Sequence, residues 1–319
     1  MALTKHPIAD LIARRGGLVI DGAMSTPLEA AGLNLNDTLW SAKALLECPD
    51  LVRKVHYDYY AAGANAVEAC SYQATEAAFA RKGIEKAEAS RLIRLSGELV
   101  REAKNDVLLE HPEWDPADLL TAGSIGPYGA YLADGSEYTG AYDLTREEYY
   151  AFHQLRLDEL LNSGMDILAI ETQPRFDEIE ALLAMIADRD ITCWVTVTLK
   201  DGDMPDGTKL EVLAKCLDAD PHVEAFGFNC VKREWVEPGL KRLSAYTDKP
   251  LVVYPNSGET YDPTTKTWHA QGVHEPDWNH YVPLWEHTGA RCIGGCCLRT
   301  LCRLRSSFIG RPRSIKEEG

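Results

Sequence analysis

The sequence has little of what a membrane, exported or nucleic-acid-binding protein needs. No apolar run approaches the roughly 18 residues of a membrane span, and residues 1–7 lack the apolar core of an export signal. Lys and Arg number 33 against 49 Asp and Glu, and the formal net charge of −16 argues against nucleic acid or an anionic membrane as a partner. Small-molecule substrates stay open, and we expect a cytoplasmic protein.

Nucleotide-binding glycine motifs are also missing. The chain has 24 glycines but no Gly-x-Gly-x-x-Gly fingerprint and no phosphate-binding P-loop, so no nucleotide cofactor is expected. The Cys-x-x-Cys pairs of structural zinc sites are absent, and the nine cysteines do not follow the spacing of a disulfide framework. Cysteines used in this way fit a reducing compartment.

What the sequence does contain is an alternation of short apolar runs with long amphipathic segments. Eight runs are continuous and apolar, as strands buried on both faces should be: 18–20, 66–69, 120–123, 167–170, 193–197, 225–228, 251–254 and 292–294. Helical stretches between them include 48–62, 86–109, 146–163 and 178–187. Eight strand-then-helix units predict an α/β protein that is a single-domain (β/α)₈ TIM barrel over residues 1–319, not an open doubly wound sheet.

Polar or thiol side chains stand where six of these strands end. They are Asp21, Ser71-Tyr72-Gln73, Glu171, Cys230, Asn256 and Cys296-Cys297. Because TIM-barrel active sites gather at the C-terminal ends of the strands, we expect these side chains to meet at one face. The loop-rich segment 128–142 is expected to form an ordered lid over this barrel mouth.

Cys230, Cys296 and Cys297 predict a zinc site. Thiolates suit tetrahedral Zn²⁺, vicinal cysteines are poorly placed to form a disulfide with each other, and three protein ligands leave a fourth position open. The alternative is that these cysteines simply pack in the core. Because successive strand residues point to opposite faces, Cys296 and Cys297 can share a metal only if the backbone leaves regular strand geometry there, which Gly294 and Gly295 would allow.

Such a zinc site suits a substrate that is itself a thiol. A coordinated thiol is deprotonated at neutral pH, and the charge of the ligands keeps it nucleophilic. Asp21 and Glu171 would hold a substrate ammonium, and backbone N–H groups around Gly22 and Ala23 would hold its carboxylate. Together these groups describe a thiol amino acid. Two alternatives stay open: Asp21 as a helix N-cap and Glu171 as the partner of Arg175.

Several motifs resemble the homocysteine S-methyltransferase family, over residues of about 16 to 309. They are DGAM at 21–24, GSIGPYG at 123–129, ET at 171–172, NC at 229–230, YPNSGE at 254–259 and GGCC at 294–297. Within the family, SYQAT at 71–75 and YGAYLADG at 128–135 resemble the branch that uses a sulfonium donor. That branch takes the methyl group from S-methylmethionine or, less well, from S-adenosylmethionine.

The resemblance implies a barrel core over about 16–309 with one zinc ion on Cys230, Cys296 and Cys297, homocysteine as the fourth ligand, and no cobalamin. The implied homocysteine contacts are Asp21, Gly22, Ala23, Ser71, Glu171 and Asn229. The implied reaction is in-line attack of the homocysteine thiolate on the donor methyl, which forms methionine without a general base at that step. Relatives commonly have threonine where this chain has Ala69, so one contact to the homocysteine carboxylate is missing or is replaced by Ser71.

A sulfonium donor should lie against aromatic faces, as cations do. The predicted donor pocket consists of Trp40, Tyr72, Gln73, Tyr128, Tyr131 and Asn256. Trp40 matches a position that contacts the quaternary ammonium in the betaine-using branch. The matching tyrosine of that branch is Gln73 here, which argues against betaine. The alternative for each aromatic residue is ordinary packing.

Other functions compete with this interpretation. The same site would accept another thiol or selenol, such as selenocysteine. A zinc-binding barrel without catalysis, for instance a subunit of a corrinoid enzyme, is a second alternative, against which the lack of a cobalamin-type domain argues. A barrel aldolase would need a Schiff-base lysine, and the best candidate, Lys200, lacks supporting partners. The acidic composition is compatible with a monomer.

Overall fold

The computed structural model describes residues 5–256, 260–262, 267–269 and 278–295. Within them, eight parallel strands form one sheet in the order β1-β10-β7-β6-β5-β4-β3-β2. Their bounds are β1 Leu18–Val19, β2 Ala66–Glu68, β3 Leu120–Ile125, β4 Ile167–Gln173, β5 Cys193–Val197, β6 Val223–Asn229, β7 Leu251–Tyr254 and β10 Ala290–Ile293. Ile20 pairs with Ala66 in a parallel bridge that joins the two edge strands. The predicted (β/α)₈ barrel is confirmed.

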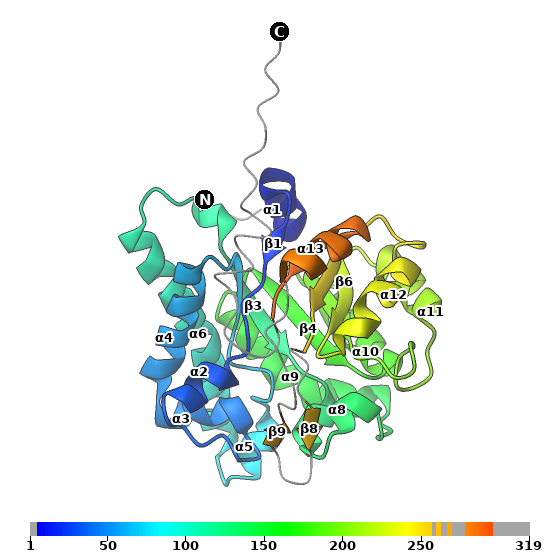
Figure 1. Cartoon of the computed structure of the whole chain (residues 1–319). Coiled ribbons are helices and arrows are strands. Elements are labelled where there is room, and N and C mark those ends of the chain that lie inside the picture. Colours follow the sequence, from blue (N-terminus) through cyan, green and yellow to red (C-terminus); the bar gives the residue numbers. More distant parts are fainter. Residues whose placement is uncertain (1–4, 257–259, 263–266, 270–277, 296–319) are drawn as a thin grey trace.

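Helices cover the outside of this barrel and cap both of its ends (Figure 1). Their bounds are α1 Pro7–Arg15, α2 Ser25–Ala30, α3 Ala44–Glu47, α4 Pro49–Ala62, α5 Glu76–Ala80, α6 Lys86–Glu110, α7 Tyr128–Leu132, α8 Ser136–Thr139, α9 Arg146–Asn162, α10 Phe176–Ile186, α11 Leu210–Ala219, α12 Arg233–Leu243 and α13 Trp278–His287. Two 3₁₀ helices, η1 Trp40–Lys43 and η2 Pro116–Asp118, and an antiparallel pair of strands, β8 Thr260–Asp262 and β9 Thr267–His269, complete the described elements. The four predicted helical stretches are α4, α6, α9 and α10.

Local sequence signals fix where the long helices begin and end. Thr145 and Glu148 form a reciprocal capping box at the start of α9, which satisfies backbone N–H groups that the first turn leaves unpaired. Helix α4 ends at Gly63, whose φ of 105° is a left-handed conformation that glycine adopts without steric cost. These signals set the end of α4 and the start of α9.

Two buried cores hold the barrel together. One lies between the sheet and the surrounding helices, and the other fills the barrel interior. The interior core includes Trp194 and Tyr254 from the strands together with Ile8 and Leu11 of α1. Figure 1 shows α1 at one end of the barrel and α2, α3, α5 and α8 at the other. Helix α1, which the sequence analysis did not identify, therefore closes the N-terminal end and leaves the C-terminal mouth for a site.

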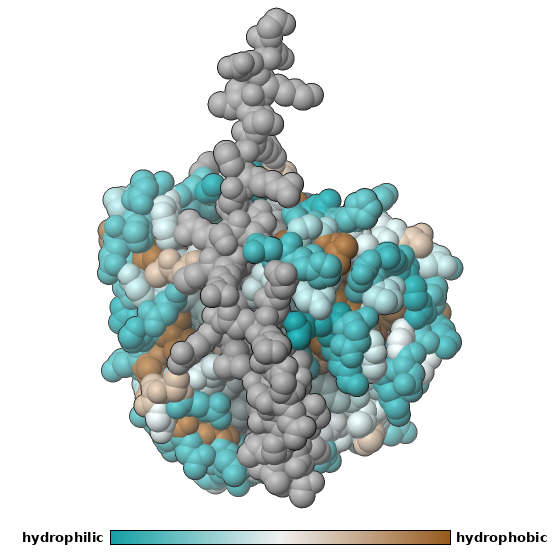
Figure 2. Space-filling model, viewed as in Figure 1, coloured by the Kyte–Doolittle hydropathy of each residue, from teal (hydrophilic) through white to brown (hydrophobic). Residues whose placement is uncertain are grey.

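The described residues place few large apolar side chains on the outer surface. Figure 2 shows a mainly hydrophilic face in which hydrophobic areas are small and separated. Among the described residues, the exposed large hydrophobic side chains are Leu46, Leu109, Val212 and Tyr246. In the same part of the chain, none of the helices has both the length and the apolar character to cross a bilayer.

Candidate active site

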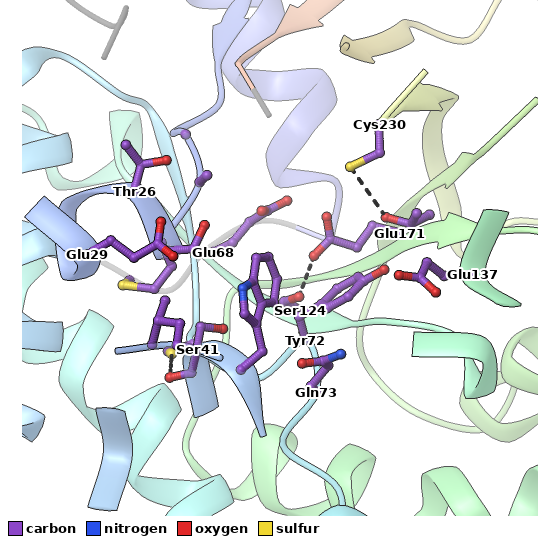
Figure 3. A pocket seen from close by; sticks show the side chains of 18 of the residues that line it. Thr26, Glu29, Ser41, Glu68, Tyr72, Gln73, Ser124, Glu137, Glu171 and Cys230 are labelled. Atoms are coloured by element: carbon purple, nitrogen blue, oxygen red, sulfur yellow. Dashed lines mark hydrogen bonds between the residues drawn. The ribbon is translucent and has the colours of Figure 1, made fainter. Parts of the chain in front are cut away.

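A cavity of about 460 Å³ opens at the C-terminal mouth of the barrel. Its lining comes from the ends of seven barrel strands and from the loops that follow them (Figure 3). The segments after β1 and β2 contribute most of it, and α8 adds Glu137. Cys230 follows β6 and Gly295 follows β10, so residues far apart in the sequence share one cavity. Of the strand-end side chains expected to meet at one face, the described lining includes Asp21, Tyr72, Gln73, Glu171 and Cys230.

Three carboxyl groups lie close together at the base of this cavity: Asp21, Glu68 and Glu171. Asp21 Oδ2 accepts a hydrogen bond of 3.0 Å from the backbone N–H of Glu68. Glu171 accepts a hydrogen bond from the Ser124 hydroxyl and another, of 3.2 Å, from the Tyr254 hydroxyl. Asp21 Oδ1 and Glu68 Oε1 are buried without a hydrogen-bond partner.

Burial makes these three carboxyl groups hard to ionise without a cation. It raises the pKa of Glu171 to about 7. Burial and the charge of Glu171 raise the pKa of Asp21 well above its usual range. Burial, the charge of Glu171 and the charge of Asp21 raise the pKa of Glu68 well above its usual range. Two acceptor oxygens without partners among three like charges form a site that a bound ammonium would satisfy.

The titratable side chains of the described lining, apart from Tyr and Cys, are all carboxyl groups. Six carboxyl groups face it, from Asp21, Glu29, Asp37, Glu68, Glu137 and Glu171, and none of its described residues is Lys, Arg or His. One of the six, Asp37, is neutralised by Lys82 at 2.8 Å. The cavity is therefore suited to ligands that carry positive charge.

Cys230 stands in a strained backbone at the end of β6. Its φ is 50°, and Thr172 at the end of β4 has φ 58°. Trp40 and Ala133 have positive φ as well, so four of the five described non-glycine residues with positive φ line the cavity. Such conformations cost of order 1–3 kcal/mol each and concentrate at functional sites.

Asn229 holds Cys230 and Thr172 beside each other. Its Oδ1 accepts the backbone N–H of Thr172 at 2.8 Å, and its Nδ2 donates to the Thr172 hydroxyl at 2.7 Å. The Cys230 Sγ lies 3.5 Å from the same Nδ2. Asn229 is fully buried behind the lining, so the structure gives this predicted homocysteine contact a positioning role.

The other predicted homocysteine residues divide into two groups. Gly22 and Ala23 line the cavity, and a Cβ on Gly22 would come within 2.9 Å of the Tyr59 hydroxyl. Ser71 is buried outside the lining and donates its hydroxyl to the Ser124 carbonyl at 2.8 Å. Ala69 lines the cavity without a polar side chain, and Ser71 does not replace it there.

Half of the predicted donor pocket reaches the cavity. Trp40, Tyr72 and Gln73 line it, and the Trp40 and Tyr72 rings meet edge to face with centroids 6.3 Å apart. Tyr128 and Tyr131 instead pack against Phe152 of α9, with centroids 4.9 and 5.5 Å away.

Asn256 is the last predicted donor-pocket residue. Its backbone N–H donates to the Val231 carbonyl at 3.0 Å. It is absent from the described lining, although its buried Oδ1 has no hydrogen-bond partner.

Two alternatives considered for the carboxylates are wrong. Helix α2 begins at Ser25 after Met24 and has no side-chain cap, so Asp21 is not an N-cap. Arg175 pairs with Asp177 at 2.6 Å and not with Glu171. Both carboxylates line the cavity instead.

Of the three predicted zinc ligands, the structure describes Cys230. Cys296 and Cys297 lie outside the described residues, and no cluster of three His, Cys, Asp or Glu side chains arranged for a metal occurs within the described ranges. Gly294 is needed for close approach, because a Cβ there would lie 2.9 Å from the Cβ of Ile20. Neither Gly294 nor Gly295 has a positive φ. The predicted departure from strand geometry concerns Cys296 and Cys297, which lie outside the described residues.

The sequence analysis missed several residues of the site. Glu68 belonged to an expected strand but was not predicted as a site residue. A charged residue at the end of an apolar run could have indicated it. Ser124 and Tyr254, which hold Glu171, and Glu137 were also missed. A buried network supports this arrangement from behind: Arg156 donates to the carbonyls of Tyr72 and Gly126 at 2.6 and 2.7 Å.

Comparison with known proteins gives consistent matches over nearly the whole chain. The sequence model described as homocysteine S-methyltransferase matches residues 18–305. The homocysteine S-methyltransferase of Escherichia coli is 48% identical over 297 residues, which cover 92% of this chain and 95% of that protein. The homocysteine S-methyltransferase YbgG of Bacillus subtilis is 43% identical and covers 98% and 99%.

A solved structure shares the fold. The metallated form of the E. coli homocysteine methyltransferase MmuM superposes with a TM-score of 0.85 and 44% sequence identity, over 96% of this chain and 100% of that one. The match includes the strand ends that build the cavity, from Asp21 to Glu171 and Cys230. This chain therefore belongs to the homocysteine S-methyltransferase family and is a methyltransferase.

Proposed function

We propose that this enzyme transfers a methyl group from a sulfonium donor to homocysteine held at a zinc ion, forming methionine. The donor would be S-methylmethionine or, less well, S-adenosylmethionine. One observation carries the proposal: the described cavity joins a thiol, a set of carboxyl groups without cationic partners, and a pair of aromatic rings. The thiol is Cys230, and the rings are those of Trp40 and Tyr72.

The homocysteine end would be recognised through its ammonium group. Asp21 Oδ1 and Glu68 Oε1 are acceptors without partners, and Glu171 lies beside them. An ammonium has three donors and would pair with these oxygens through charge-assisted hydrogen bonds. The substrate carboxylate would lie toward the backbone of Gly22 and Ala23, which line the same cavity.

The described residues fit a thiolate-bound zinc ion at the top of the same cavity. The Cys230 side chain faces the cavity in Figure 3, and Gly295, which directly precedes Cys296 and Cys297 in the chain, also lines it. Zinc bound to these three thiols would keep the thiol of the substrate deprotonated at neutral pH. The thiols must stay reduced to act as ligands, which favours the cytoplasm as the compartment.

The residues of the chain would then align the two substrates. In the transfer, the homocysteine sulfur forms a bond to the donor methyl carbon, and the methyl–sulfonium bond breaks with its electron pair staying on the donor sulfur. S-methylmethionine thereby becomes a second methionine. Trp40 and Tyr72 would place the sulfonium against aromatic faces, and Asp21, Glu68 and Glu171 would fix the acceptor, so catalysis depends on alignment.

The test is methyl transfer to homocysteine from S-methylmethionine, S-adenosylmethionine and betaine, measured beside zinc content. Wild type, Cys297→Ala and Cys230→Ala would be compared with Cys216→Ala, which changes a thiol on α11 outside the cavity. We expect methionine formation from the sulfonium donors alone, lost together with zinc in the first two variants and kept in the third. Bound zinc without transfer from any sulfonium donor would refute the assigned reaction.

A further inference from the structure

Glu137 is a cavity carboxylate that stands apart from Asp21, Glu68 and Glu171. It belongs to α8, and its Oε2 is buried without a hydrogen-bond partner. Gln73 is a second acceptor of this kind: its side chain is 8% exposed, its Oε1 has no partner, and its Nε2 is engaged by the Ala130 carbonyl at 2.7 Å. Two unsatisfied acceptors therefore line a part of the cavity that the acceptor site does not use.

Tight packing holds Glu137 in this position. A Cβ on Gly129 of α7 would lie 2.6 Å from the Glu137 backbone nitrogen, so α7 and α8 approach closely only because residue 129 is glycine. Arg175 Nη1 donates to the Tyr142 carbonyl at 2.6 Å and so holds the C-terminal end of the segment 128–142, which contains α7 and α8. Burial also raises the pKa of Glu137 to about 7. The fold accepts the cost of a buried carboxylate here without a cationic partner among the described residues that line the cavity.

We propose that Glu137 and Gln73 hold the α-ammonium group of the methyl donor. In Figure 3 the Tyr72 ring lies between Glu68 and Glu137, so the two sets of acceptors flank the aromatic residue expected to face the sulfonium. Both sulfonium donors carry an α-ammonium with N–H groups distant from the reacting methyl, whereas the α-nitrogen of betaine carries the reacting methyl itself and has no N–H. This inference rests on the proposed sulfonium-dependent reaction. It assigns to Glu137 and Gln73 the selection of donors that are amino acids.

The experiment compares two donors that differ in one group. S-methylmethionine and its desamino analogue, 4-(dimethylsulfonio)butanoate, share the sulfonium and the carboxylate. With wild type, we expect kcat/KM to favour S-methylmethionine by about 10-fold or more, the range of a hydrogen bond to a charged group. Glu137→Gln should raise the KM of S-methylmethionine by about the same factor and leave the KM of the analogue unchanged.

A matched control and two further readouts separate this role from a structural one. Glu147→Gln changes an exposed glutamate in the first turn of α9 and should leave both donors unaffected. Zinc content and the KM of homocysteine should stay constant in Glu137→Gln, because the acceptor site is built from other residues.

Three results would overturn the inference. One is equal loss for the two donors in Glu137→Gln, which would place the carboxylate at the sulfonium, and another is no loss for either. The third is equal kcat/KM of the wild type for the two donors. This result would overturn the inference even if the Glu137→Gln variant fails to fold. Failure of the proposed reaction is a separate result, because wild type would then transfer no methyl group from any sulfonium donor.

Discussion

Replacing Asp21 by asparagine would separate the binding role of this carboxylate from its role in the fold. Asp21 Oδ2 accepts the Glu68 backbone N–H at 3.0 Å, and an asparagine carbonyl oxygen can keep that bond. The atom that changes is Oδ1, which is buried without a partner and is expected to accept from the substrate ammonium. The substitution therefore removes one charge and one acceptor at nearly constant shape.

The expected effect on catalysis follows from that one lost interaction. A hydrogen bond to a charged group contributes about 1.5–3 kcal/mol, which corresponds to a fall of about 10- to 100-fold in kcat/KM for homocysteine. Initial rates at saturating S-methylmethionine would measure it. Asp58→Asn, which changes an exposed partner of Lys54 on α4, is the control and should keep the wild-type value.

Stability should move in the opposite direction. Burial and the Glu171 charge raise the pKa of Asp21, so the folded protein binds this proton more tightly than the unfolded chain does. The wild type therefore loses stability as pH rises from the usual carboxyl pKa through the raised one, a loss that the variant does not share. Urea unfolding of the ligand-free proteins should show a more stable Asp21→Asn variant at pH 8 and a smaller difference at pH 5. A variant with unchanged kcat/KM, or one less stable at pH 8, would refute this reasoning.

Three further predictions concern residues around the site. The ligand-free wild type should lose roughly 3 kcal/mol of unfolding free energy between about pH 4.5 and 7, because burial raises the pKa of Glu171 from 4.5 to about 7, and a urea series on Glu171→Gln should lack this component. Gly22→Ala should destabilise the fold by about 1–3 kcal/mol, because the new Cβ would lie 2.9 Å from the Tyr59 hydroxyl. Thermal melts should show recovery when Tyr59→Phe removes that hydroxyl, and no recovery would contradict the contact. Both ring nitrogens of His56 are buried without partners and burial lowers its pKa to about 3, so His56→Leu should stabilise the protein by about 1–3 kcal/mol in calorimetry with unchanged methyl transfer.

The barrel could be predicted from the sequence because its strands are buried on both faces. Strands β5 and β7 have the predicted bounds, since both are fully buried runs in which Thr196 is the only residue that is neither aliphatic, aromatic nor Cys. Strand β6 begins two residues before the predicted start, at Val223-Glu224. The Glu224 side chain accepts hydrogen bonds from Thr192 and from the Ala9 backbone, so a charged residue can belong to the buried part of the strand. Such partners, distant in the chain, are not visible to pattern reading.

The candidate site was predictable only where one strand end determines the position. Asp21, Glu171 and Cys230 reach the cavity because each lies within two residues of the C-terminal end of a barrel strand. Tyr128 and Tyr131 looked equally suited to hold a cation, but their rings pack on Phe152, which comes from another helix. Whether an aromatic ring packs or faces a cavity depends on tertiary partners, and spacing along the chain does not encode them.

The strained backbone around the cavity also matters for engineering this enzyme. Trp40, Ala133, Thr172 and Cys230 hold left-handed conformations that L-residues with a Cβ rarely adopt. Glycine at any of the four would remove the backbone strain there. Selection of a variant library for heat resistance alone would therefore favour glycine at these positions. Each such gain would remove a side chain that lines the cavity. Directed evolution of a more robust catalyst should therefore keep these four codons fixed and look for stability at the opposite, α1 end of the barrel.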